Sequence, residues 1–257
     1  MAAPALRVLE HRLMLYRRTW RGSLFNSFLS PVLFLGAMGV GLGGYVDRAG
    51  GAALGGVPYL AFLAPGLLAA TAMQTAAGEA TFPILAAISW VRQYQAMLAT
   101  PIRIRDIVLG QIGFFVVRLA LVATIFVVVV VALGVAHSAS ILLAVPAAVL
   151  TGLAFATPIA AVSSRLRDGS QFSLIFRFGI TPLFLFSGTF FPIEQLPELI
   201  RPIAYVTPLY HGVALSRGLA LGTLTPVDGL VHTVYLVALA IAGAVLFEWQ
   251  LGRRLAR

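Results

Sequence analysis

The chain contains no cysteine and no lysine among its 257 residues. The missing cysteines exclude disulfides, thiolate nucleophiles and thiolate metal sites. The missing lysines exclude the phosphate-binding loop of an ATPase, which needs a lysine after its glycines, and Schiff-base chemistry, which needs a lysine amine. This chain can build none of these sites.

Charged side chains are also scarce. Only 11% of the residues are charged and 60% are hydrophobic, which leaves too little polar surface for a soluble domain. The nine acidic residues are scattered, so no paired carboxylates or activated nucleophile of an enzyme can be recognised. We predict no catalytic site and no cofactor or metal bound by this chain. The histidines show no metal-ligand spacing and are expected to be isolated polar side chains: His11, His137, His211 and His232.

What the chain has is a row of six long apolar segments. About 20 helical residues, at roughly 1.5 Å per residue, cross the roughly 30 Å hydrocarbon core of a bilayer. The sequence therefore predicts an all-α polytopic membrane protein with a single six-span transmembrane domain over about residues 24–250. The predicted transmembrane helices are Leu24–Gly44, Val57–Ala77, Ile107–Leu133, Ile141–Ser163, Phe172–Phe191 and Leu230–Leu246.

Arginine is distributed unequally between the two ends of these helices. Thirteen arginines lie in the segment 1–23, the second and fourth loops and the tail 251–257, against three on the other side. Because basic residues concentrate on the cytoplasmic side, both termini are predicted to be cytoplasmic. The net charge of +9 is dispersed around the spans and forms no basic patch with aromatics, which argues against a nucleic-acid partner.

Two segments outside the spans have a distinct pattern. In residues 1–23, a helical face with period three to four predicts an amphipathic helix in the cytoplasmic headgroup layer, either as an anchor or as a lever joined to a cytoplasmic partner. The proline-rich segment 192–225 is predicted to form a re-entrant hairpin on the outer face, because a seventh span would place the basic tail outside. The apolar face of the first segment comprises Leu6, Leu9, Leu13, Tyr16 and Trp20.

The second loop, residues 90–106, combines apolar and basic side chains. A short helix ending before Pro101 would expose Met97 and Leu98, which are flexible apolar side chains suited to a partner's groove. The pattern is compatible with a docking helix or with an ordinary interfacial loop.

Several runs of this sequence are similar to those of a known family. They are the segments 79–82, 94–101 and 106–110, the segment Phe186-Ser187-Gly188-Thr189-Phe190-Phe191-Pro192, and the segment 205–211. The chain resembles the permease subunits of ABC-2 type exporters, especially the branch with nodulation-factor (lipo-oligosaccharide) and drug-resistance exporters. The resemblance implies a six-span subunit of a bacterial plasma membrane that forms a homodimer or heterodimer.

The same resemblance implies that each second-loop helix contacts a separate ABC ATPase subunit, present in two copies, which binds ATP and Mg. Gln95 departs from the acidic residue expected in many relatives, which puts the electrostatics of that contact in question. The implied ATPase-coupling residues are Tyr94, Gln95, Met97, Leu98, Thr100 and Pro101. The implied residues of the outer re-entrant motif are Ser187, Gly188, Phe191, Pro192, Pro208 and Tyr210.

Three ionisable residues lie inside predicted spans and are candidates for function. Arg118 and Arg177 either extend back to the headgroups along their apolar stems or bind an anionic substrate headgroup. Glu79 is expected to be the structural partner of a nearby arginine or, less in keeping with its position near a span end, part of a proton relay.

The sequence therefore predicts a permease subunit of an ATP-driven exporter that moves an amphipathic or lipid-linked substrate, such as a lipo-oligosaccharide, a glycolipid or a hydrophobic drug. The alternative is a secondary transporter driven by an ion gradient. Such transporters usually show acidic groups near the midplane or two related halves, and neither is recognisable here.

Overall fold

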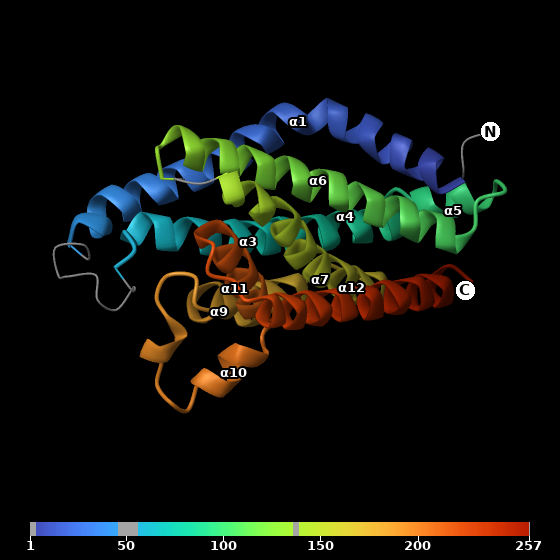
Figure 1. Ribbon diagram of the computed structural model, residues 1–257. Helices are drawn as coiled ribbons and strands as arrows, with labels where there is room; N and C mark the ends of the chain where they lie inside the picture. The colour runs from blue at the N-terminus through green and yellow to red at the C-terminus, as the bar shows by residue number, and fades with distance from the viewer. Residues whose placement is uncertain (1–3, 46–55, 136–138, 257) are drawn as a thin grey trace.

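The computed structural model describes residues 4–45, 56–135 and 139–256, and within these ranges it is helical without strands (Figure 1). Figure 1 shows an elongated bundle in which both chain termini lie at the same end, together with helix α5. The long helices are α1 (Pro4–Gly36), α3 (Tyr59–Ala80), α6 (Ile104–Ala132), α7 (Ala144–Arg165) and α12 (Pro226–Leu255). The short ones include α4 (Phe82–Leu85), α5 (Gln93–Leu98), α8 (Phe172–Leu174), α9 (Thr181–Phe186), α10 (Arg201–Val206) and α11 (Pro208–Leu221).

Four helices of the described residues are long and apolar enough to cross a membrane: Tyr59–Trp90, Ile104–Ala132, Ser140–Arg165 and Pro226–Leu255. They contain the second, third, fourth and sixth predicted spans, except for a few terminal residues. The first of them joins α3, α4 and the π-helical segment η3 (Ala86–Trp90). The polytopic helical class is therefore confirmed, and the count of six remains a prediction.

The first predicted span, Leu24–Gly44, lies in the second half of α1 and in the π-helical segment η1 (Ala37–Gly43). Several side chains of this stretch fall outside the described ones, including residues 23–28. The predicted boundary at residue 23 coincides with no break, because α1 is one continuous helix.

The fifth predicted span is shorter than expected. The apolar helix here is Phe172–Phe186, below the roughly 20 residues needed to cross a bilayer untilted. It contains the π-helical segment η5 (Ile175–Ile180), and Pro182 is the second residue after that segment. A proline donates no backbone hydrogen bond and its ring crowds the preceding turn, which accounts for the wider turn at this point. The Thr181 hydroxyl donates to the carbonyl of Phe176 at 2.9 Å across that turn.

Helix α3 lies at the centre of the bundle and packs against α6, α7 and α11. The apolar window of the span that contains α3 is 72% buried, whereas that of α12 is only 17% buried. The alanines that dominate the buried face of α3 allow close approach between helices. The outer face of α12 is therefore left for lipid or for another subunit.

The N-terminal half of α1 packs along α6, and its buried face differs from the predicted one. Val8 and Arg12 are buried, whereas Leu6 and Trp20 are exposed. Tyr16 meets Phe114 of α6 edge to face, with ring centroids 6.1 Å apart. The predicted apolar face is right at Leu9, Leu13 and Tyr16, which pack against the core, and wrong at Leu6 and Trp20. The neighbouring helix, and not side-chain apolarity alone, selects which side is buried. Its location in the headgroup layer stays a prediction.

The proline-rich segment 192–225 folds into a short 3-10 turn, η6 (Ile193–Gln195), and the helices α10 and α11. Thr207 caps α11, since its hydroxyl accepts a hydrogen bond from the Tyr210 amide at 3.3 Å, and Pro208 occupies the first turn. Helix α11 packs between α3, α7 and α12, whereas α10 stands apart from the long helices (Figure 1). The depth of this segment in a membrane stays a prediction.

Candidate functional site

The second-loop helix α5 spans Gln93–Leu98 and ends before Pro101, as the sequence predicts. It follows Arg92, whose backbone is left-handed with a φ of 54° and turns the chain sharply. Tyr94 is completely buried and its hydroxyl donates to Oε1 of Gln111 in α6 at 3.3 Å. The side-chain amide of Gln95 donates to the backbone carbonyl of Ile88 at 2.8 Å. Helix α5 is therefore fixed to both neighbouring elements.

The prediction that Met97 and Leu98 are exposed is wrong. Both are half-buried and pack against the main hydrophobic core. The large apolar side chains exposed beside α5 are Trp90 and Val91, at 63% and 69%. Thr100 is exposed and its hydroxyl donates to the carbonyl of Met97 at 2.6 Å. Sequence reasoning missed Trp90 and Val91, although two consecutive bulky apolar residues before a basic turn were a usable signal.

The structure brings Glu79 and Arg118 together from α3 and α6. Nε of Arg118 lies 3.0 Å from Oε1 of Glu79, and their side chains are 6% and 22% exposed. The Arg118 guanidinium also lies over the ring of Tyr16 in α1, at 5.0 Å from its centroid. The Arg118 side chain thus contacts the two helices that pack beside α6. This pair ties three helices together within the bundle.

A cavity of about 350 Å³ opens beside this pair. Glu79 lines it together with Arg12, Arg18, Tyr16 and Phe114. Its wall therefore combines aromatic surface with both signs of charge, a lining suited to the polar end of an amphipathic molecule.

Arg177 lies elsewhere, in the π-helical segment η5, and its side chain is exposed. Within the described part of the chain the Glu79–Arg118 contact is the single ion pair, so Arg177 has no acidic partner there. Arg118 and Arg177, which have the same predicted roles, therefore differ in the structure: Arg118 is buried and paired with Glu79, whereas Arg177 is exposed.

The outer motif Ser187–Pro192 forms a tight loop after α9. Gly188 has a φ of +78°, a conformation that favours glycine because it lacks a Cβ. Ser187 is buried and its hydroxyl donates to the carbonyl of Leu183 at 2.6 Å. Phe191 and Tyr210 pack against a small apolar cluster of Ile193, Leu196 and Ala204.

Arg217 of α11 holds this loop in place. Its Nη2 donates to the carbonyls of Gly188 at 2.9 Å and Thr189 at 3.3 Å, and its Nε donates to the carbonyl of Phe62 at 3.1 Å. The guanidinium lies 3.6 Å from the centroid of the Phe62 ring. Gly66 leaves the space this requires, since a Cβ there would lie 2.7 Å from Nη2. We call these contacts the Arg217 clamp.

Sequence reasoning counted Arg217 only as one of three charges on the outer side. The available signal was a single arginine in a helix with no other Arg, Lys, Asp or Glu. Its carbonyl partners come from α3 and from the loop after α9, which are far away in the sequence and could not be inferred from it.

Two histidines predicted to be isolated in fact meet. Nδ1 of His211 lies 2.8 Å from Nδ1 of His232, which joins α11 to α12. The His211 ring stacks on Tyr235 with centroids 3.9 Å apart. At this distance one nitrogen must carry a proton and the other must accept it. His137 lies outside the described residues, and in those described no three His, Cys, Asp or Glu side chains are grouped to hold a metal.

These helices and contacts define a polytopic α-helical membrane protein with a short helix, α5, at the end that carries both termini. The chain belongs to the ABC-2 type transporter family, whose sequence pattern matches residues 6–221. The family resemblance drawn from the sequence is thereby confirmed.

Individual relatives cover most of the chain. Nodulation protein J of Rhizobium leguminosarum bv. trifolii is 35% identical over 207 residues, which are 80% of this chain and 77% of that protein. Nodulation protein J of Rhizobium meliloti (strain 1021) is 32% identical over 241 residues, 93% of this chain and 89% of that protein. The probable multidrug ABC transporter permease YbhS of Escherichia coli (strain K12) is 27% identical over 204 residues, 76% of this chain and 52% of that protein.

Family membership gives the class of function. The chain is a permease, the multi-pass membrane subunit of an ABC transporter, and such subunits work with an ABC ATPase. Its role is transport, which agrees with a sequence that lacks the lysine of a phosphate-binding loop.

Proposed function

We propose that this permease exports an amphipathic or lipid-linked molecule, such as a lipo-oligosaccharide, a glycolipid or a hydrophobic drug, from the cytoplasm or the inner leaflet. The relative named as a probable multidrug permease supports the hydrophobic drug, and the resemblance to nodulation-factor exporters supports the lipid-linked substrates. The cavity beside Glu79 supports it as well, because aromatic and charged side chains line it together. The membrane is a bacterial inner membrane, and both termini are cytoplasmic.

The observation that carries the proposal is the fixed position of α5. Helix α5 lies at the end of the bundle that carries both termini, and the hydrogen bond between Tyr94 and Gln111 joins it to α6. Trp90 and Val91, just before α5, are exposed. A partner that binds these apolar side chains can therefore move α6 as it moves α5. We infer that an ABC ATPase is this partner and that ATP and Mg bind to it.

The transmission route continues from α6 into the bundle. The Glu79–Arg118 contact joins α6 to α3, and α3 touches the Arg217 clamp through the carbonyl of Phe62. A displacement of α6 would therefore reach the outer loop through three contacts: Arg118 with Glu79, Phe62 with Arg217, and Arg217 with the loop after α9. Two permease copies, identical or related, and two ATPase subunits complete the transporter.

The test compares two single substitutions of exposed apolar residues. Trp90→Asp places a charge on the surface beside α5, whereas Leu199→Asp places one in the segment after η6, where Leu199 is 88% exposed. Both chains are co-expressed with the ATPase and purified in mild detergent. The proposal predicts that Trp90→Asp loses the bound ATPase and its substrate-stimulated hydrolysis, and that Leu199→Asp keeps both.

Equal retention of the ATPase by both variants would show that α5 is not the docking element. A chain whose transport runs on a proton gradient, without an ATPase, would instead establish the alternative of an ion-driven transporter. The exposed positions are chosen over Met97 and Leu98 because a charge at a half-buried position would also disturb folding.

A further inference from the structure

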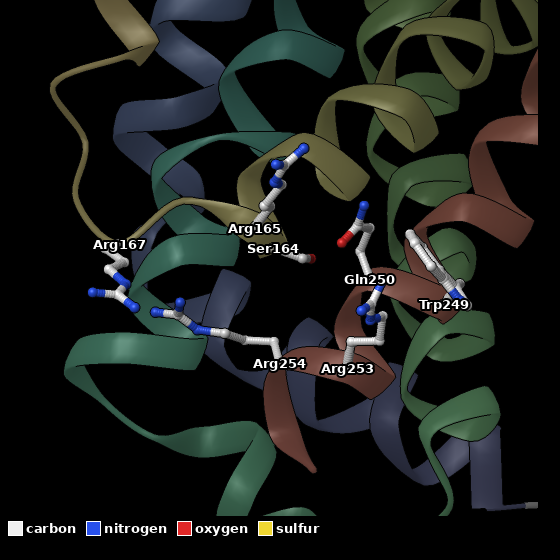
Figure 2. Close-up of a pocket in the computed structure, with 7 residues that line it drawn as sticks. All are labelled: Ser164, Arg165, Arg167, Trp249, Gln250, Arg253 and Arg254. Carbon is white, nitrogen blue, oxygen red and sulfur yellow. The ribbon is translucent and has the colours of Figure 1, made fainter. Parts of the chain in front are cut away.

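Four arginines line one pocket at the ends of α7 and α12. Arg165 and Arg167 come from the end of α7 and the residues after it, and Arg253 and Arg254 come from the last turn of α12 (Figure 2). The pocket has a volume of about 640 Å³, within the range of small-ligand sites. Its remaining lining residues are Ser164, Trp249 and Gln250.

Basic residues in the last turn of a helix have an ordinary explanation, because they interact favourably with the helix dipole and follow the positive-inside rule. That explanation accounts for each arginine separately. It does not explain why arginines from the ends of two different helices line the same cavity. Figure 2 shows the side chains of Arg167 and Arg254 pointing toward one another across it.

None of the four arginines forms an ion pair with an acidic side chain of the described residues. The single ion pair there is the distant Glu79–Arg118 contact. Asp168 is next in sequence to Arg167, but its carboxylate accepts hydrogen bonds from Ser170, including one from the Ser170 amide at 2.9 Å. Those bonds hold the pKa of Asp168 below its ordinary value. Like charges that line one pocket without an ion-pair partner favour an external anion.

An apolar stripe leads along α12 to the pocket. Ile241, Val245 and Trp249 are all exposed and stand four residues apart, so they share one helical face. Arg253 continues this line, and its guanidinium lies 4.7 Å from the centroid of the Trp249 ring. The stripe therefore offers an acyl chain a continuous surface that ends at the arginines.

We propose that this pocket binds the phosphate of an anionic phospholipid headgroup, with an acyl chain along the α12 stripe. Arginine matches phosphate geometry through paired N–H donors, and basic pockets between transmembrane helices suit anionic headgroups. The site is separate from the α5 surface and from the cavity beside Glu79. It stands whether or not α5 docks an ATPase.

The absence of cysteine from the chain allows a direct test. Gln250→Cys places a single thiol in the pocket, and its modification by a water-soluble maleimide is followed in detergent-purified full-length protein. Phosphatidylglycerol in mixed micelles is expected to slow modification, whereas phosphatidylcholine at the same concentration is not. The same assay with glycerol 3-phosphate distinguishes a lipid from a soluble phosphate. Protection by phosphatidylglycerol alone would show that the acyl chain is required. Protection by both would show a phosphate site that is also open to soluble ligands.

A matched pair of double variants in the Gln250→Cys chain tests the arginines. Each arginine near an anionic lipid strengthens binding roughly fivefold, so Arg253→Gln with Arg254→Gln should weaken phosphatidylglycerol protection roughly 30-fold. Arg7→Gln with Arg17→Gln removes the same charge from exposed positions of α1 and should leave protection unchanged.

Three results would overturn the proposal. Equal protection by phosphatidylcholine and phosphatidylglycerol would show an unselective lipid surface. Equal loss in the two double variants would show an effect of net charge alone. Protection only in the presence of an ATPase subunit would assign the pocket to a protein contact.

Discussion

Arg217 and the arginines of the pocket between α7 and α12 have the same side chain in two different environments. Arg217 is half-buried, and its Nε and Nη2 donate to the carbonyls of Phe62, Gly188 and Thr189. The arginines at the other end of the bundle face a cavity and have no carboxylate partner among the described residues. An arginine satisfied by its own chain fixes the fold, whereas a group of arginines left open is available to a ligand.

The largest expected effect is on the Arg217 clamp. Arg217→Ala leaves buried carbonyls without donors, which should lower the free energy of unfolding by about 3 kcal/mol. The measurement is thermal unfolding in detergent by circular dichroism. Arg201→Ala is the control, since Arg201 also donates to backbone carbonyls but its bond to Glu194 is exposed. If both variants lower the free energy of unfolding equally, the Arg217 clamp stabilises the fold no more than the contacts of Arg201 do.

A smaller loss is expected at the Glu79–Arg118 pair. Glu79→Gln leaves the Arg118 side chain, which is only 6% exposed, without its carboxylate partner. This should destabilise the protein by about 2 kcal/mol, which is less than for a fully buried pair because Glu79 itself is partly exposed. The double variant with Arg118→Gln should recover part of that loss. A double-mutant cycle from unfolding midpoints measures the coupling, and strictly additive effects would contradict a direct interaction.

The smallest expected effect on stability concerns α5. Tyr94→Phe removes one hydrogen bond, to Gln111 at 3.3 Å, and should cost about 1 kcal/mol or less. The informative readout is the ratio of substrate transported to ATP hydrolysed, which should fall if Tyr94 links α5 to α6. An unchanged ratio together with unchanged stability would show that the bond transmits nothing.

Much of the fold could be predicted because it rests on local properties of the sequence. Long apolar runs such as Ile107–Leu133 must lie in helices inside a membrane, since no other backbone arrangement of a single segment satisfies its own hydrogen bonds there. Pro101 likewise restricts the backbone before it, and α5 ends at Leu98.

The features that could not be predicted depend on neighbours from distant parts of the chain. Arg12 is buried because α6 lies against α1, and His211 meets His232 because α11 packs on α12. Arg217 finds its acceptors on two other elements. None of these contacts leaves a periodic pattern, and a single sequence contains no record of which helices touch.

The central claim is that this permease is driven by a separate ATPase that docks beside α5. The most direct measurement is a pull-down of the tagged protein from its native membrane in gentle detergent, with mass spectrometry and an ATPase assay of the product. The account predicts a stoichiometric ATPase with a phosphate-binding loop that hydrolyses ATP and is lost from the Trp90→Asp variant. A chain that purifies alone, without nucleotide-dependent activity, would contradict it.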